Sequence, residues 1–221
     1  MKNRDYREFA AGEIYHLYNR GNGKMDIFRN ARDYEQFLLR LFVLLGASRE
    51  DVDGDKLTDA KLRLRLAYFG KGTFELICYC CMPNHFHLAL RQCAETPLSE
   101  LILKLCTSYS MYLNRKYEHS GHVFQGRFMA VRIENDRQLK HLSAYIHLNP
   151  RVARLVNQAE SWPHSSYSEY LGITDTHRCE KSVVLDQFRS HKAYEAFVED
   201  SFEDIDARKM LRTQIEGLSF D

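Results

Sequence analysis

Apolar residues recur at two different spacings along the first 150 residues, and each spacing predicts one type of element. Short runs rich in β-branched and aromatic residues predict four strands, at residues 13–20, 73–81, 85–91 and 123–134. Apolar residues three and four positions apart predict three amphipathic helices, at residues 31–45, 98–117 and 136–148. The third helix should stop at Asn149, because the residue before a proline disfavours the helical region.

The order of these elements predicts the fold class. Strand, helix, strand, strand, helix, strand is the split βαβ order, so we expect an α+β protein with a ferredoxin-like antiparallel sheet and helices packed on it. Residues 46–59 are charged and predict a loop or insertion, and the alternation at 62–66 suits a short strand. We divide the chain into a main domain, residues 1–174, and a tail, residues 175–221. The composition of the tail is acidic and predicts a small helical appendage.

Composition indicates the size of the core and the cellular compartment of the protein. Its apolar residues, 44% of 221, suffice for one sizeable core. No run approaches the ~18 apolar residues of a membrane helix, and the charged N-terminus has no apolar core of a secretory signal. Three of the six cysteines crowd one predicted strand, which suits free thiols better than disulfides. We therefore expect a cytoplasmic protein without membrane contact.

The net charge of +1 conceals an asymmetry between the two ends of the chain. Residues 1–154 hold 24 Lys and Arg against 17 Asp and Glu, whereas residues 155–221 hold 7 against 13. The basic excess is concentrated between Lys104 and Arg154. A basic region of this kind favours a polyanionic partner such as nucleic acid, although an ordinary solvated surface would have the same charges.

Two histidines separated by one apolar residue stand at the start of the third predicted strand. Side chains alternate along a strand, so His85 and His87 share one face and Phe86 takes the other. Two imidazoles on one face can hold a divalent cation, or they can be two hydrogen-bonded polar residues of an ordinary strand. A zinc site formed with Cys78, Cys80 and Cys81 is disfavoured, because their spacing is not the usual one.

The third predicted helix carries a second pair of chemically capable residues. Tyr145 and Asn149 lie one turn apart, beside the apolar stripe of the helix. A tyrosine can act as a covalent nucleophile, but Tyr145 can equally be a half-buried core residue and Asn149 a capping amide. Tyr109 and Tyr112 lie on the apolar stripe of the second helix, which predicts core packing rather than catalysis.

Five short stretches of the chain, in this order, resemble one known family. They are Tyr15-His16-Leu17-Tyr18-Asn19-Arg20-Gly21, Met82-Pro83-Asn84-His85-Phe86-His87-Leu88, Ser120-Gly121-His122-Val123-Phe124-Gln125-Gly126-Arg127-Phe128, Tyr145-Ile146-His147-Leu148-Asn149-Pro150 and Trp162-Pro163-His164-Ser165-Ser166-Tyr167. Together they cover residues 10–172 and are similar to the REP-associated tyrosine transposases, single-strand transposases with a His-hydrophobe-His (HUH) metal pair and one catalytic tyrosine. The resemblance does not extend to the acidic tail.

The resemblance implies an activity and a set of site residues. It implies a metal-dependent endonuclease and strand transferase that acts on single-stranded DNA hairpins through a 5′-phosphotyrosine. Tyr145 would be the nucleophile, His85 and His87 metal ligands, and Asn149 a third ligand. Imidazole suits Mn²⁺ and oxygen ligands suit Mg²⁺, so we expect one of these two ions.

The basic half of the chain supplies the expected contacts to DNA. The predicted contacts are Arg20, Arg115, Lys116, Gln125, Arg127, Arg132, Lys140 and Arg151. On the fourth predicted strand Arg127 and Arg132 fall on opposite faces, so at most one of them should line the site. A monomer and a homodimer are both compatible with the sequence. The alternative function is a non-catalytic single-stranded nucleic-acid-binding domain, with Tyr15, Tyr18 and Phe128 as stacking platforms.

Overall fold

The computed structural model describes residues 9–47 and 69–209. The predicted strand at 62–66 and most of the predicted loop before it lie outside these residues. The chain groups into two compact units. Of the described residues, the first unit holds 9–47, 69–77 and 81–133, and the second holds 78–80 and 134–209.

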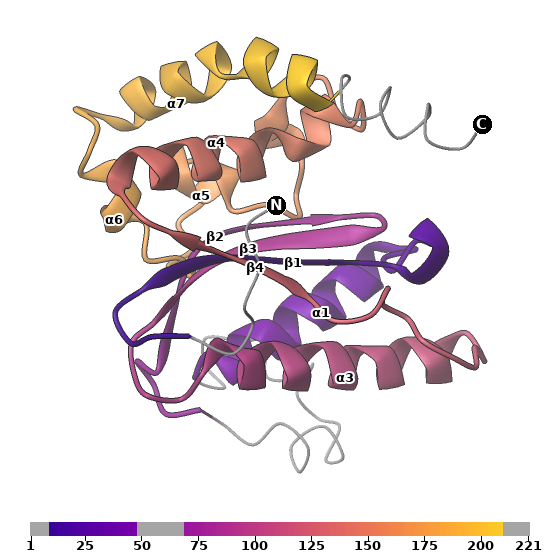
Figure 1. The fold of residues 1–221 in the computed structure, drawn as a ribbon. Coiled ribbons are helices and arrows are strands. Elements are labelled where there is room, and N and C mark those ends of the chain that lie inside the picture. The colour runs from indigo at the N-terminus through magenta and orange to yellow at the C-terminus, as the bar shows by residue number, and fades with distance from the viewer. Residues whose placement is uncertain (1–8, 48–68, 210–221) are drawn as a thin grey trace. The chain divides into compact units, whose positions relative to one another are not determined.

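The first unit is built on an antiparallel sheet of four strands in the order β2-β3-β1-β4 (Figure 1). The strands are β1 (Ile14–Arg20), β2 (Phe74–Met82), β3 (His85–Gln92) and β4 (Met129–Ile133). Both β3 and β4 pair with β1 in antiparallel register. Only Pro83 and Asn84 separate β2 from β3, a connection short enough for a hairpin.

Helices α1 (Ala31–Leu44) and α3 (Leu98–Lys116) lie side by side and cover one face of this sheet (Figure 1). The ring of Phe37 on α1 packs 4.9 Å from Phe86 on β3 and 5.2 Å from Tyr109 on α3. Tyr109 is fully buried and donates a hydrogen bond to the Ile27 carbonyl, so it is a core residue. A short 3₁₀ turn, η1 (Asn22–Lys24), follows β1.

The predicted fourth strand was too long. Pairing with β1 begins only at Met129. Residues 121–128 form a loop that makes an isolated bridge between Phe124 and Gly21, the residue that follows β1. Gly126 explains the break, because its φ of +79° belongs to the left-handed region and not to a strand. Arg127 therefore precedes β4 instead of lying on it, and the face assigned to it by alternation does not apply.

The second unit contains α4 (Asp136–Val152), η3 (Ala159–Ser161), α5 (Tyr167–Tyr170), α6 (Ser182–Leu185) and α7 (His191–Asp200). The prediction that α4 stops at Leu148 was wrong, because the helix continues through Pro150 to Val152. Both of these residues are buried. Their burial offsets the one hydrogen bond that proline cannot donate near the end of a helix.

The α+β, split βαβ fold class is confirmed by this arrangement, and helices occur in the predicted appendage. Helices α6 and α7 belong to the same compact unit as α4. The functional boundary at residue 174 stays a prediction. Over the described part of the chain, none of the helices has the length and apolar character that a membrane span requires.

Candidate catalytic and nucleic-acid-binding site

The two histidines of β3 lie on the face of the sheet opposite to α1 and α3. Phe86 between them packs on α1, so alternation turns His85 and His87 away from the helices. Their ring centroids are 4.9 Å apart. Two imidazoles that share an ion at metal–nitrogen distances of about 2.0–2.1 Å have centroids within roughly 6.5 Å, so this spacing permits a common ion.

Polar neighbours hold both imidazoles in place. The Nδ1 atom of His85 lies 2.6 Å from Asn84 Oδ1, and the Nδ1 atom of His87 lies 3.0 Å from His16 Nε2. His16 comes from β1, where the ring of Tyr18 stacks on it at 4.9 Å. In the β1–β3 register Tyr18 is directly opposite His87. His16 and Tyr18 therefore extend the histidine pair into a cluster of four rings.

The side chains on this face of the sheet supply only some of the ligands that a divalent ion needs. Among the residues described, no group of three or more His, Cys, Asp or Glu side chains is arranged to hold a metal. The two imidazoles would therefore need a further ligand of another type, and an amide oxygen such as that of Asn149 has the required chemistry. The described cysteines are free thiols, and burial raises the pKa of Cys78 and Cys80.

Tyr145 and Asn149 lie on α4, in the second unit. Tyr145 is half-buried and Asn149 is 5% exposed. The predicted catalytic set is thus divided between the units, with the histidines in the first and the tyrosine and amide in the second. The convergence of all four residues on one phosphate stays a prediction.

A buried hydrogen-bond chain fixes α4 within its unit. His147 is fully buried, with Nδ1 2.7 Å from Tyr194 Oη and Nε2 2.9 Å from Ser166 Oγ. Tyr194 donates to Ser143 Oγ, so its oxygen accepts the proton of His147 Nδ1. Ser166 can then donate to Nε2 while it accepts from the Tyr79 N–H. Burial lowers the pKa of His147 to about 3, so this imidazole is neutral.

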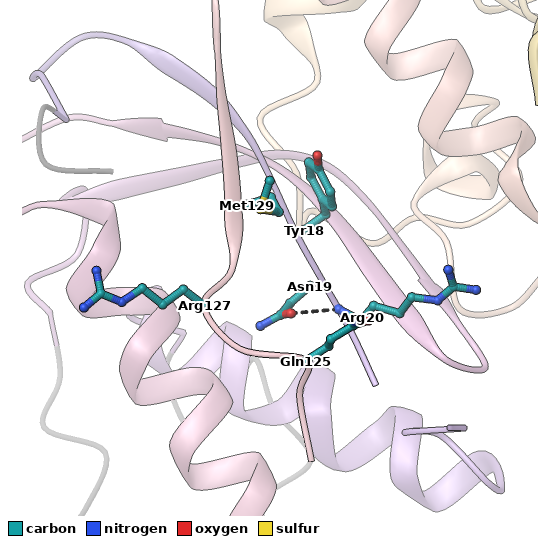
Figure 2. Close-up of a pocket in the computed structure, with 6 residues that line it drawn as sticks. All are labelled: Tyr18, Asn19, Arg20, Gln125, Arg127 and Met129. Atoms are coloured by element: carbon teal, nitrogen blue, oxygen red, sulfur yellow. Dashed lines mark hydrogen bonds between the residues drawn. The ribbon is translucent and has the colours of Figure 1, made fainter. Parts of the chain in front are cut away.

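A pocket of about 280 Å³ opens where β1 ends beside the 121–128 loop (Figure 2). It is lined by Tyr18, Asn19, Arg20, Gln125, Arg127 and Met129. Asn19 connects its two walls, because its Nδ2 donates to the Gly126 carbonyl and its Oδ1 accepts from the Arg20 N–H. Arg20 and Arg127 extend in opposite directions from the pocket, and Tyr18 and Met129 stand together at another edge (Figure 2).

This pocket brings together three of the predicted DNA contacts. Arg20, Gln125 and Arg127 are all exposed. Two divergent guanidinium groups can hold two phosphates of one strand on either side of the pocket, while an amide and an aromatic ring are available to a base between them. Tyr15, named above as a stacking platform, is 4% exposed and is covered by Phe9, so it has little surface to offer a base.

The other predicted contacts have different surroundings. Three of them pair with acidic groups: Lys116 with Asp33, Arg132 with Glu13, and Arg151 with Glu199. Lys140 lies over the ring of Phe188, and Arg115 is exposed on the last turn of α3.

Sequence reasoning did not single out His16, Asn84 or Asn19. Alternation along β1 puts His16 on the same face as Tyr18, but only the register with β3 reveals that His16 reaches His87. Asn84 and Asn19 were each part of a motif without an assigned role. Their roles depend on carbonyl groups far away in the sequence, those of Lys24 and Gly126.

Comparison with known proteins finds one matching family and one curated relative. Residues 41–149 match the family described as "Transposase IS200 like". The chain is also similar to a protein of Haemophilus influenzae named as a REP-associated tyrosine transposase. The two are 28% identical over 153 residues, which cover 62% of this chain and 83% of the relative.

A solved structure has the same fold. It is that of a REP-associated tyrosine transposase bound to a REP hairpin, and it superposes with a TM-score of 0.56 at 16% sequence identity. The match covers 81% of this chain and 98% of the other. At this identity the likeness is one of fold.

Proposed function

We propose that this protein cleaves and rejoins single-stranded DNA at hairpins, with a divalent metal ion and a 5′-phosphotyrosine intermediate. The observation that carries the proposal is the pair of imidazoles on β3, 4.9 Å apart and turned away from the helices, in a chain that matches the IS200-like transposase family over residues 41–149. A structural relative bound to a REP hairpin supports DNA hairpins as the substrate class.

The metal would be Mn²⁺ or Mg²⁺, held by His85, His87 and Asn149. When bound, such an ion polarises a non-bridging oxygen of the scissile phosphate and stabilises the charge that develops on it. Two imidazoles and one amide leave coordination positions for the phosphate and for water, as a catalytic site needs.

Tyr145 supplies the nucleophile. Its phenol oxygen loses its proton to solvent and attacks phosphorus, which forms the phosphotyrosine bond and breaks the bond from phosphorus to the 3′ oxygen. The 3′ oxygen leaves with the electron pair and takes up a proton. Because the new bond is also a phosphodiester, a second 3′-hydroxyl can attack it and join two strands without ATP.

Arg20, Arg127 and Gln125 hold the strand near the pocket. The two arginines neutralise phosphates and position the chain of nucleotides, whereas the exposed Gln125 amide can both donate to and accept from a base edge. An unpaired base can lie flat on the ring of Tyr18, which lines the same pocket.

The direct test is formation of a covalent adduct. A hairpin oligonucleotide is incubated with the protein and Mn²⁺, and adducts are separated in SDS. A label on the 3′ end of the DNA should migrate with the protein, whereas a 5′ label should be released on the fragment with the free 3′-hydroxyl. Tyr145→Phe should abolish the adduct and keep hairpin binding, because only one hydroxyl is lost.

Tyr167→Phe is the matched control. Tyr167 is 1% exposed on α5, and its hydroxyl makes no hydrogen bond within the described chain, so its loss should leave adduct formation unchanged. An adduct in Tyr145→Phe would show that another residue is the nucleophile. Hairpin binding by the unmodified protein without any adduct, in either metal, would instead support the non-catalytic alternative.

A further inference from the structure

The histidine pair makes two hydrogen bonds with the same pattern. In each imidazole the Nδ1 atom faces a neighbouring polar group, Asn84 Oδ1 for His85 and His16 Nε2 for His87. A neutral imidazole carries one proton, so the group that faces Nδ1 decides which nitrogen is protonated and which keeps its lone pair.

For His85 the direction of the hydrogen bond follows from the amide beside it. The Nδ2 group of Asn84 donates to the Lys24 carbonyl at 3.2 Å, which turns Oδ1 toward His85. An amide oxygen only accepts, so His85 must donate from Nδ1 across the 2.6 Å contact. The lone pair of neutral His85 is then on Nε2.

For His87 the partner is another imidazole, so either ring could donate. If His87 is to bind an ion through Nε2, it must carry its proton on Nδ1, and His16 Nε2 then accepts it at 3.0 Å. The ring of Tyr18, stacked on His16 at 4.9 Å, keeps the accepting ring in this orientation. The two histidines then have the same tautomer.

We infer that His16 and Asn84 are positioning residues that hold His87 and His85 as Nδ1-protonated tautomers, so that both Nε2 atoms are available to one divalent ion. This inference rests on the proposed function, which makes the two histidines the metal ligands. His16 and Asn84 act through the ligands and need not touch the ion or the DNA.

Nitrogen NMR of the metal-free protein tests the tautomers directly. With ¹⁵N-labelled histidine, His85 and His87 should each show a protonated Nδ1 and an unprotonated Nε2 above pH 7. His16→Phe keeps an aromatic ring against Tyr18 but removes the acceptor, so His87 should lose its fixed tautomer while His85 keeps its own. His16→Gln offers an amide oxygen and should restore the His87 signal.

Metal titration gives the second readout. Calorimetry with Mn²⁺ alone should show affinity about 10–100-fold weaker in His16→Phe and in Asn84→Ala, the usual effect of losing such a hydrogen bond. Asn84→Asp and His16→Gln, which keep an acceptor, should stay close to the unmodified protein. His122→Phe, at an exposed histidine of the same unit, is the control for loss of an imidazole.

The possible results distinguish a failure of this inference from a failure of the proposed function. A His87 protonated on Nε2, or equal Mn²⁺ affinity in His16→Phe and the unmodified protein, would overturn the inference and leave the proposed function intact. Failure of the unmodified protein to bind Mn²⁺ or Mg²⁺ would remove the metal from the proposed function and would overturn this inference with it.

Discussion

At the scale of single residues, the predicted DNA contacts differ in whether their charge is available. Arg20 and Arg127 are exposed and have no carboxylate of the described residues within ion-pair distance. Lys116 instead lies 2.6 Å from Asp33, whose side chain is fully buried. Burial alone would raise the pKa of Asp33, but hydrogen bonds from Lys116, Tyr117 and others lower it below its usual value.

We expect Arg20→Gln and Arg127→Gln to weaken binding to a single-stranded hairpin site. Each should also reduce the slope of log affinity against log salt by about 0.7, because each releases one contact to a phosphate of a single strand. A salt titration by fluorescence anisotropy measures both quantities. An unchanged slope in both variants would show that the pocket does not bind the phosphate backbone.

Lys116→Gln should behave differently. Its loss leaves Asp33 buried with fewer charge-assisted hydrogen bonds, so we expect the free energy of unfolding to fall by about 2 kcal/mol. The salt slope should stay unchanged, because Lys116 is already paired with Asp33 and does not contact a phosphate. Urea unfolding together with the same salt titration would distinguish this structural role, and a reduced slope would contradict it.

The residues of the histidine pair could be found from sequence because alternation along a strand is a local property. Phe86 between them packs on α1 as the pattern predicts. The partners of the pair could not be found in the same way, since they depend on strand register and on one amide orientation. His16 meets His87 across 71 residues of sequence, and Asn84 is oriented by Lys24 across 60.

At the scale of elements, the 121–128 loop places two of the three predicted DNA contacts that line the pocket, Gln125 and Arg127. Gly126 lies between Gln125 and Arg127 with a φ of +79°, and a Cβ atom there would meet nothing within 4 Å. Any cost of a side chain at this position is therefore one of backbone conformation, about 1–2 kcal/mol.

Gly126→Ala should consequently reduce hairpin affinity several-fold by shifting Gln125 and Arg127. The strand register of β4 and the binding of Mn²⁺ should be preserved, because neither involves this loop. Anisotropy and calorimetry on the same protein preparation measure the two effects. Parallel loss of metal and DNA binding would indicate general misfolding and contradict this expectation.

Helix α4 should show a pH-dependent stability that comes from its buried histidine. The pKa of His147 is about 3 in the fold and about 6.5 in an unfolded chain. Between these values only the unfolded chain binds the proton. The free energy of unfolding must therefore fall as the pH decreases from 6.5 toward 3, by up to about 1.4 kcal/mol for each pH unit.

His147→Gln tests this sign. Glutamine can donate and accept but does not titrate, so the variant should lose less stability than the unmodified protein between pH 6.5 and 4.5. Trp162, the one tryptophan of the sequence, belongs to the same unit and provides a fluorescence signal for urea unfolding. His177→Gln, at an exposed histidine, should follow the unmodified protein. Identical pH profiles for all three would contradict the argument.

The elements themselves were predictable to different degrees. Strands β1, β2 and β3 and helices α1 and α3 have clear periodicity, and their bounds fall within one residue of the prediction. The end of α4 was missed because a local rule about Asn149 before proline was outweighed by burial of Val152. The length of β4 was missed because Gly126 sits in a run of β-forming residues.

At the scale of the whole molecule, residues of the basic region form ion pairs with residues of the acidic tail within the second unit. Arg151 and Arg154, at the end of α4, pair with Glu199 and Asp206 of the acidic tail. Both guanidinium groups also lie over the ring of Phe202, at 4.0 and 5.7 Å. The negative charge of the tail opposes binding to a polyanion, and these pairs show which basic residues it neutralises.

Removing the tail is a poor test of this idea. Tyr194 on α7 is fully buried and hydrogen-bonded to His147 and Ser143, so truncation at residue 174 would expose the interior of the unit. Substitutions that change charge without changing shape avoid this difficulty. Glu199→Gln combined with Asp206→Asn releases both arginines and leaves the apolar contacts of α7 in place.

We expect this double variant to bind a scrambled single-stranded oligonucleotide more tightly than the unmodified protein. Its salt slope should become steeper by up to about 0.7 for each arginine that gains a phosphate contact. Glu195→Gln with Asp200→Asn makes the same change in net charge at two exposed acidic residues of α7 for which the structure records no ion pair among the described residues. If this control raised affinity and slope as much as the double variant, the effect would come from net charge rather than from the release of Arg151 and Arg154.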